Sequence, residues 1–222
     1  MTLASCDSRK TAGENPFFTE WDTPHGVPPF DKILPEHFMP AFERGMSLHE
    51  AEIDAITSNK DEATFENTIL AYDNAGQMLA QTELVFGMLC AAETNDRMQA
   101  LQEQAMPLLA AHRDKIRLDD KLFVRVKEVY DRRAALGLDA EQMRLLQKTY
   151  DSFVRAGALL DAEQKARLKE INGQLSLTAV KFGNNILAEN NNFVLELKSD
   201  ELDGLPAGIR DAAREKAQQV GK

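Results

Sequence analysis

Cysteine, tryptophan and tyrosine are all scarce in this chain. Its 222 residues include 2 cysteines, 1 tryptophan and 3 tyrosines. Two cysteines, Cys6 and Cys90, exclude a framework of several disulfides, and their spacing is not that of a zinc-binding motif. Cys90 ends the apolar run 84–90, which predicts a buried thiol that packs as a small hydrophobic group.

Basic residues are also in deficit. The chain contains 26 lysines and arginines and 36 aspartates and glutamates, so its formal net charge is −10. Nucleic-acid binding requires a clustered basic face, and this composition therefore excludes a nucleic-acid partner. No segment approaches the ~20 consecutive apolar residues of a membrane span.

Catalytic signatures are missing too. A zinc peptidase of the His-Glu-x-x-His class needs two histidines four residues apart on one helix face, with a glutamate between them. None of the four histidines has another that close; they are His25, His37, His49 and His112. The chain has no Gly-x-Ser-x-Gly elbow, phosphate-binding loop or dinucleotide fingerprint. We therefore predict no catalytic, cofactor-binding or metal-ligating residue, and interpret each histidine as a surface or hydrogen-bonding group.

What the sequence does contain is a series of helix signals. Pro35 suits a first helical position, and the helix is predicted to run to about Thr57. A proline inside the third helix, Pro107, is predicted to kink it. Further starts are predicted from capping residues and capping boxes, namely Thr64, Asn95, Asp119 or Asp120, Asp139 with Gln142, and Asp161 with Gln164.

Two apolar stripes recur at helical spacing, and each predicts one buried helix face. The first consists of Met143, Leu146, Tyr150, Phe153 and Gly157, and the second of Leu168, Ile171, Leu175, Ala179, Phe182 and Ile186. Asn190 to Asn192 should end the helix that carries the second stripe. Residues 193–197 are predicted to form a short strand, and a last helix is expected from Ala207 to Val220. The predicted fold class is all-α with one late strand.

The chain divides by composition into three parts. Residues 1–14 are polar and are predicted to be a disordered tether. Residues 15–34 hold four of the eight prolines, together with Gly26, and these residues interrupt regular structure. The same segment includes Phe17, Phe18, Trp21, Val27 and Phe30, which predict an irregular arm packed on the body. Residues 35–222 form the predicted helical region.

Several ordered segments resemble the opening of one enzyme family. They are residues 27–33, 35–43, 64–69, 91–95, 109–112, 122–130, 153–157, 165–168, 171–172, 175–176, 181–183 and 202–206. In this order they are similar to the peptidyl-dipeptidase and thimet-oligopeptidase-like zinc metallopeptidases, from about Asn15 to about Ala217. The closest resemblance is to the bacterial peptidyl-dipeptidases, which release dipeptides from peptide C-termini.

The resemblance implies a function for the complete protein. Such enzymes are helical ellipsoids split by a deep channel, and they bind zinc through His-Glu-x-x-His and a later glutamate. Their N-terminal helices form the wall and roof that admit only short peptides. These zinc ligands have no counterpart here, so we expect a chain that is inactive alone. Its expected partners are short peptides, through the complete enzyme, and the catalytic region of the same protein.

An alternative interpretation stays open. The chain would then be a stand-alone, non-catalytic helical protein of the cell envelope that binds peptides or a partner. In-frame coding sequence beyond Lys222 that reaches His-Glu-x-x-His would favour the peptidase; a stop codon would favour the alternative.

Cys6 is a candidate lipidation site. Leu3-Ala4-Ser5-Cys6 matches the pattern cut by bacterial lipoprotein signal peptidase, although a chance match in four residues is the alternative. Only five residues precede Cys6, so an export signal would require an earlier start. A lipoprotein would lie in the bacterial cell envelope or periplasm, attached to the membrane only through its lipid; otherwise a cytoplasmic location is expected.

Overall fold

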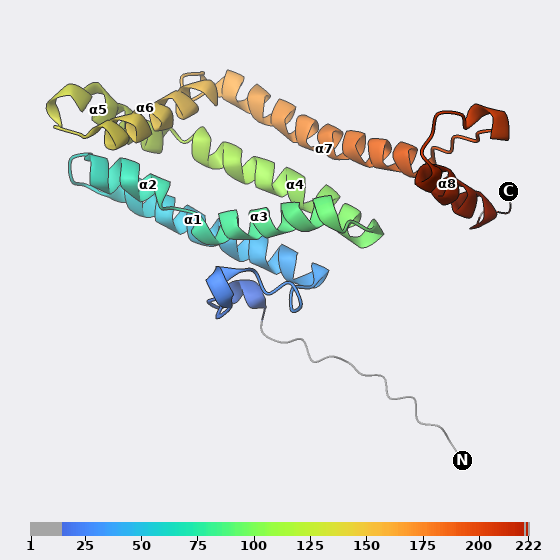
Figure 1. The fold of residues 1–222 in the computed structure, drawn as a ribbon. Helices are drawn as coiled ribbons and strands as arrows, with labels where there is room; N and C mark the ends of the chain where they lie inside the picture. Colours follow the sequence, from blue (N-terminus) through green and yellow to red (C-terminus); the bar gives the residue numbers. More distant parts are fainter. Residues whose placement is uncertain (1–14, 220, 222) are drawn as a thin grey trace, which may run out of the picture. The chain divides into compact units, whose positions relative to one another are not determined.

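The computed structural model describes residues 15–219 and residue 221. The predicted tether 1–14, with Cys6, lies outside the described residues. The chain divides into two units, Met1–Phe182 and Gly183–Lys222, and all regular structure in the described part is helical (Figure 1). The predicted all-α class is confirmed.

Eight α-helices are found in the described residues. They are α1 (Phe38–Ser58), α2 (Ala71–Asp73), α3 (Gln77–Ala92), α4 (Asp96–Arg117), α5 (Asp120–Asp131), α6 (Ala140–Arg155), α7 (Ala162–Asn192) and α8 (Ala207–Gln219). Short 3-10 turns lie at Pro16–Phe18, Pro24–Gly26, Pro35–His37, Arg133–Ala135 and Ser199–Glu201, and a π-helical turn at Phe65–Leu70 precedes α2.

The helix starts follow the predicted caps. The Asn95 side chain accepts a hydrogen bond from the backbone N–H of Met98, and Asp119 does the same for Leu122. Asp139 and Gln142 exchange hydrogen bonds between side chain and backbone, as a capping box requires. Helix α4 continues on both sides of Pro107.

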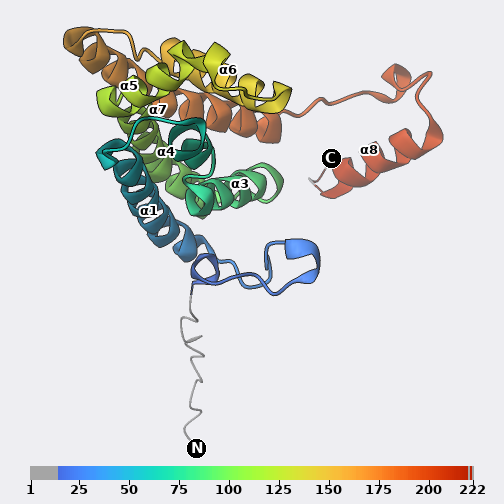
Figure 2. The same cartoon turned by 90° about the vertical axis from the view of Figure 1, so that its left-hand side faces the viewer.

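The core of the first unit consists of two hydrophobic clusters. The first lies near the arm and includes Phe38, Phe42, Phe86 and Leu109. The second, near α5 and α6, includes Ile69, Leu122, Leu146 and Phe153. Helix α1 packs against α3, α4 and α5, and so runs past both clusters (Figures 1 and 2).

Glycine 45 allows α1 and α3 to approach closely. A Cβ atom added to Gly45 would lie 3.0 Å from the Cα of Leu79 on α3. Such a contact is tighter than ordinary van der Waals packing, so the residue type at this position sets the spacing of the two helices.

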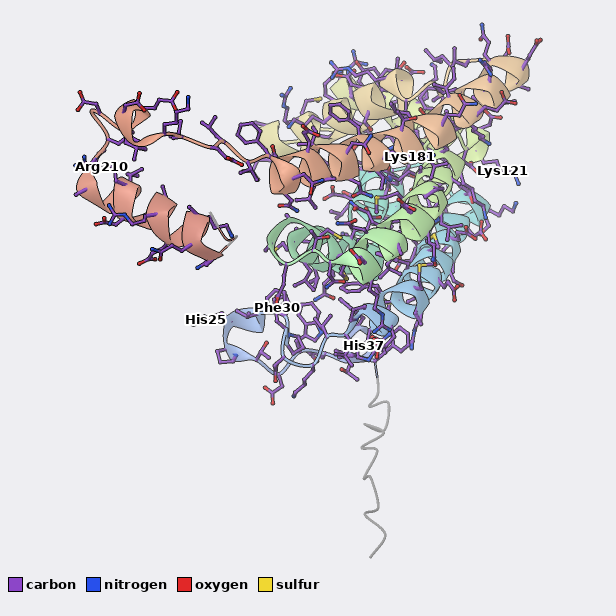
Figure 3. The ribbon with its side chains drawn as sticks, turned by 90° about the vertical axis from the view of Figure 1, so that its right-hand side faces the viewer. His25, Phe30, His37, Lys121, Lys181 and Arg210 are labelled. Atoms are coloured by element: carbon purple, nitrogen blue, oxygen red, sulfur yellow. The ribbon has the colours of Figure 1, made fainter. Side chains whose placement is uncertain are left out.

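The arm, residues 15–34, contains only the two short 3-10 turns. Phe17 and Ile33 are buried in the first cluster, and the Trp21 indole donates a 2.8 Å hydrogen bond to the carbonyl of Pro16. Val27 and Phe30, in contrast, are exposed, and Figure 3 shows Phe30 with His25 on the outer loop of the arm. The expectation that the arm's large apolar residues pack on the body is wrong for Val27 and Phe30.

Two further sequence predictions need correction. Residues 193–197 form no strand, because a strand needs a hydrogen-bonded partner and none is found in the described residues. The second apolar stripe is not a buried face: Ile171, Leu175, Phe182 and Ile186 are all exposed. The first stripe is buried as predicted at Leu146 and Phe153.

The second unit holds the end of α7, the extended segment after it, and α8. Helix α8 has no buried residue, and Ile209 on it is exposed. Over the residues that the structure describes, no helix combines the length and the apolar character that a membrane crossing would need.

Candidate functional site

A groove of about 600 Å³ lies between α4 and the first part of α7, and the end of α6 closes one side. All its lining residues belong to the first unit. Met106, Leu168, Leu175 and Val180 make part of the lining apolar. Val180 is one of only two buried residues on α7, which means that the helix contacts the body at the groove and leaves most of its surface open.

Three arginines also line the groove. Arg113 and Arg117 are four residues apart, on one face of α4, and Arg155 is the last residue of α6. The lining contains one acidic residue, Asp114, whose Oδ1 accepts a 2.8 Å hydrogen bond from Asn172 on α7. This bond joins the two walls of the groove and engages the carboxylate.

The arginines have no ion-pair partner within 4.0 Å among the residues that the structure describes. Burial raises the pKa of the Glu83 carboxyl, and the nearby charge of Arg113 partly offsets this rise. Burial raises the pKa of Tyr72, and Arg117 opposes this rise through its charge and through a side-chain hydrogen bond to Tyr72. The groove thus carries three positive groups against one carboxylate.

A second polar cluster joins α1 to α4 on the other side of α4. His49 Nδ1 and His112 Nε2 lie 3.0 Å apart, although 63 positions separate the two residues. Glu50 Oε1 lies 3.5 Å from His112 Nδ1, and Glu50 Oε2 lies 2.8 Å from Lys115 Nζ. The carboxylate favours a proton on His112 Nδ1, which leaves Nε2 to accept a hydrogen bond from His49.

The histidine pair is held in its neutral form. Burial lowers the pKa of His112, and burial together with the neighbouring His112 lowers the pKa of His49. The hydrogen bond from Lys115 lowers the pKa of Glu50. The chain of contacts from Lys115 to His49 therefore contains one ion pair and two neutral imidazoles.

The residues present do not fit the zinc that the family resemblance implies. Within residues 15–219 and 221, no three histidine, cysteine, aspartate or glutamate side chains are grouped as metal ligands. His49 and His112 point their nitrogens at each other, and Glu50 lies beside the opposite nitrogen of His112. Three ligands around one point, as catalytic zinc needs, are not formed here.

The sequence missed the histidine pair. The prediction that each histidine is a surface or hydrogen-bonding group holds for His25, which is exposed, and for His37, whose Nδ1 accepts a hydrogen bond from the backbone N–H of Leu34. It gives no sign that His49 and His112 bond to each other. No local pattern links His49 to His112. Cys90 is half-buried and burial raises the pKa of its thiol, in keeping with the predicted packing role.

The chain is similar to several known peptidases. It is 41% identical to dipeptidyl carboxypeptidase of Escherichia coli K12 over 176 residues, which cover 79% of this chain and 26% of the relative. The enzyme of the same name from Salmonella typhimurium is 38% identical over 78% of this chain and 26% of the relative. Oligopeptidase A of E. coli is 24% identical over 88% of this chain and 29% of the relative. No family model matches the chain.

The chain thus spans about a quarter of the length of the curated relatives it matches. Its similarity to the two dipeptidyl carboxypeptidases covers more than three quarters of its own residues. Both the ordered sequence segments and the all-helical fold agree with that relationship. The chain belongs to the family of the dipeptidyl carboxypeptidases and oligopeptidases.

Proposed function

We propose that this chain is the N-terminal helical part of a zinc peptidyl-dipeptidase, where it forms a wall and roof of the substrate channel. The observation that carries the proposal is the 41% identity to E. coli dipeptidyl carboxypeptidase over 79% of the chain. The remaining three quarters of the complete protein would supply zinc, its ligands and the catalytic base. The role of this part is to limit access to short peptides.

The exposed face of α7 supports the proposal that a separate catalytic region of the same protein packs against this chain. Leu175 and Phe182 are 62% and 65% exposed on the same helix, and Ile171 and Ile186 continue the stripe. Large apolar patches are uncommon on proteins that function alone. We propose that the catalytic region of the same protein covers this stripe.

A chimaera tests the proposal. The part of E. coli dipeptidyl carboxypeptidase that matches this chain is replaced by the chain, and release of C-terminal dipeptides is measured. We expect the chimaera to be active and a variant lacking the part altogether to be inactive. Full activity of the deletion variant, or a folded chimaera with no activity, would contradict the proposal.

We further propose that the natural precursor is exported and lipidated on Cys6, because Leu3-Ala4-Ser5-Cys6 matches a lipoprotein cleavage pattern. The gene is expressed from its true start, and the mass of the N-terminal peptide is measured. A diacylglyceryl adduct on Cys6 in the membrane fraction is expected. An unmodified Cys6 in a cytoplasmic fraction would reject this and favour the cytoplasmic alternative.

A further inference from the structure

The second unit of the chain, Gly183–Lys222, has no core of its own. None of its described residues is buried. A segment that becomes ordered must bury apolar surface to offset the conformational entropy that it loses. The second unit therefore needs further protein to cover it.

Residues 193–197 of this unit are both apolar and open to solvent. Four large apolar side chains are between 45% and 70% exposed; they are Phe193, Val194, Leu195 and Leu197. The segment belongs to no helix or turn, and Figure 2 shows it as part of the extended connection between α7 and α8. Phenylalanine and valine are among the residue types enriched in strands.

The backbone of this segment is held at its two ends and is open between them. The N–H of Phe193 donates a hydrogen bond to the carbonyl of Glu189 in α7, and the N–H of Lys198 donates one to the carboxylate of Glu201. For Val194, Leu195 and Leu197, no backbone hydrogen bond is found within the residues that the structure describes. Open N–H and C=O groups along an extended segment can pair with a neighbouring strand.

The side chains of the segment have the alternation of a strand that covers a core with one face. In an extended conformation, Phe193, Leu195 and Leu197 point to one side. Val194 and Glu196 point to the other side. One face is thus wholly apolar and the other carries a charge, which is typical of a strand with one buried and one solvated face.

We propose that residues 193–197 add as a strand to the edge of a β-sheet in the catalytic region of the same protein. In this mode of binding, main-chain hydrogen bonds give affinity and alternate side chains give specificity. The inference rests on the proposed function, because about three quarters of the length of E. coli dipeptidyl carboxypeptidase lies outside the part that matches this chain. It adds a contact through the backbone to the one proposed for the stripe on α7.

A second copy of the chain fits the segment less well than a sheet that already exists. Two copies paired through residues 193–197 would form a ribbon of only two strands, which is marginally stable in water. Addition to a sheet gives three or more strands and a core beneath the apolar face. The catalytic region can supply such a sheet, whereas the described part of this chain contains none.

Hydrogen exchange measured by mass spectrometry tests the strand. Backbone amides of residues 194–197 should exchange rapidly in the isolated 222-residue chain, because they are open there. In the chimaera with the rest of E. coli dipeptidyl carboxypeptidase, exchange of part of these amides should be at least about 100-fold slower. The protection is expected in only part of them, since an edge strand uses alternate N–H groups in its pairing.

Proline variants of the chimaera separate backbone pairing from side-chain packing. Proline removes the N–H that a strand donates, so either Val194→Pro or Leu195→Pro should abolish the protection. The matched controls, Val194→Ala and Leu195→Ala, shorten the side chains but keep the N–H, and should retain most of the protection. Circular dichroism of the isolated variants checks that the helices are intact.

Three results would overturn the strand. One is exchange of residues 194–197 that is equally fast in the chimaera and in the isolated chain. Another is protection that survives both proline variants. The third is protection in the isolated chain that grows with its concentration, which would assign the segment to a second copy.

Release of dipeptides by the same chimaera reports on the proposed function separately. An active chimaera in which residues 194–197 are unprotected would overturn the strand and leave the proposed function standing. A folded but inactive chimaera in which they are protected would support the strand and contradict the proposed function.

Discussion

The contact between His49 and His112 links the stability of the first unit to pH. Both side chains are neutral in the folded chain and have lowered pKa values, for which the main cause is burial. Lys115, Arg113 and Glu50 face the pair from α4 and α1, and Glu52 acts on His49 from α1. Protonation of either ring would remove an acceptor and place a charge at the α1–α4 contact.

Stability should therefore fall on mild acidification. The unfolded chain binds protons near the ordinary histidine pKa of about 6.5, whereas the folded chain resists protonation until a lower pH. The stabilisation is thus complete above about pH 6.5 and is lost as the pH falls toward the lowered folded-state values. Thermal unfolding followed by circular dichroism at several pH values should show this decline.

Glutamine variants give the control for the pH effect. In His49→Gln/His112→Gln the dependence of the melting temperature on pH between about 5 and 8 should flatten. His25→Gln should keep the parent slope, because His25 is exposed and makes no contact with the pair. An unchanged slope in the double variant would show that other groups cause the effect.

Glycine 45 gives a second test at the scale of one residue. Gly45→Ala should destabilise the fold by about 1–3 kcal/mol, because the added methyl group meets the Leu79 backbone on α3 and forces the helices apart. Gly87→Ala is the matched control, since a Cβ there meets nothing within 4 Å; it should stabilise α3 by about 0.5–1 kcal/mol. Denaturant titration of both variants measures the difference, and equal effects would contradict the packing argument.

At the scale of the elements, helix α7 is sparsely covered for its length. Only Lys165 and Val180 of its 31 residues are buried. The Lys165 ammonium pairs with Asp120 at the start of α5 and so fixes the first turn of α7 to the body. Beyond that turn, Ile171, Leu175, Phe182 and Ile186 of the apolar stripe are exposed.

The isolated chain should consequently bind a hydrophobic dye or self-associate at micromolar concentration. Leu175→Gln/Phe182→Gln should reduce both dye fluorescence and association, because these side chains are 62% and 65% exposed on α7. Leu84→Gln, at a 66% exposed position on α3, is the control and should change little. A monomeric, dye-silent parent chain with a sharp melting transition above about 60 °C would contradict this and favour a self-sufficient protein.

Local signals predicted the helix starts but not the partners of the helices. A cap such as Asp139 with Gln142 depends on residues three positions apart, so the sequence contains all of it. The pattern of residues 193–197 suits a strand, but a strand forms only where another segment pairs with it. The stripe on α7 likewise predicts that a face is covered without identifying what covers it.

The same limit applies to the two polar sites. His49 and His112 meet across 63 positions, and the groove arginines come from two helices. Neither arrangement has a spacing that a motif could detect. Only the packing of α1 on α4 brings the two histidines together, and only the position of the end of α6 near α4 brings Arg155 into the same lining as Arg113 and Arg117.

At the scale of the whole molecule, we expect the 222-residue chain to have no peptidase activity and to bind no zinc tightly. The reason is that no third ligand accompanies His49 and His112 within the described residues, and catalytic zinc sites use three protein ligands. Metal analysis after dialysis and an assay for dipeptide release check this. One equivalent of retained zinc together with chelator-sensitive release would contradict it.

The long-range hydrogen bonds of Arg125 have a consequence for the order in which parts of the chain fold during synthesis. This buried side chain on α5 donates hydrogen bonds to the carbonyls of Asn59 and Asp61 and to the side chain of Asn67, across 66, 64 and 58 positions. The loop before the π-helical turn therefore leaves the ribosome some 60 residues ahead of the group that anchors it. At about 5–20 residues per second, that loop waits about 3–12 s without its anchor. A ribosome-bound chain stalled before Arg125 has emerged should accordingly be cleaved by protease within residues 59–64. A chain stalled after Arg125 has emerged and α5 has folded should resist cleavage there.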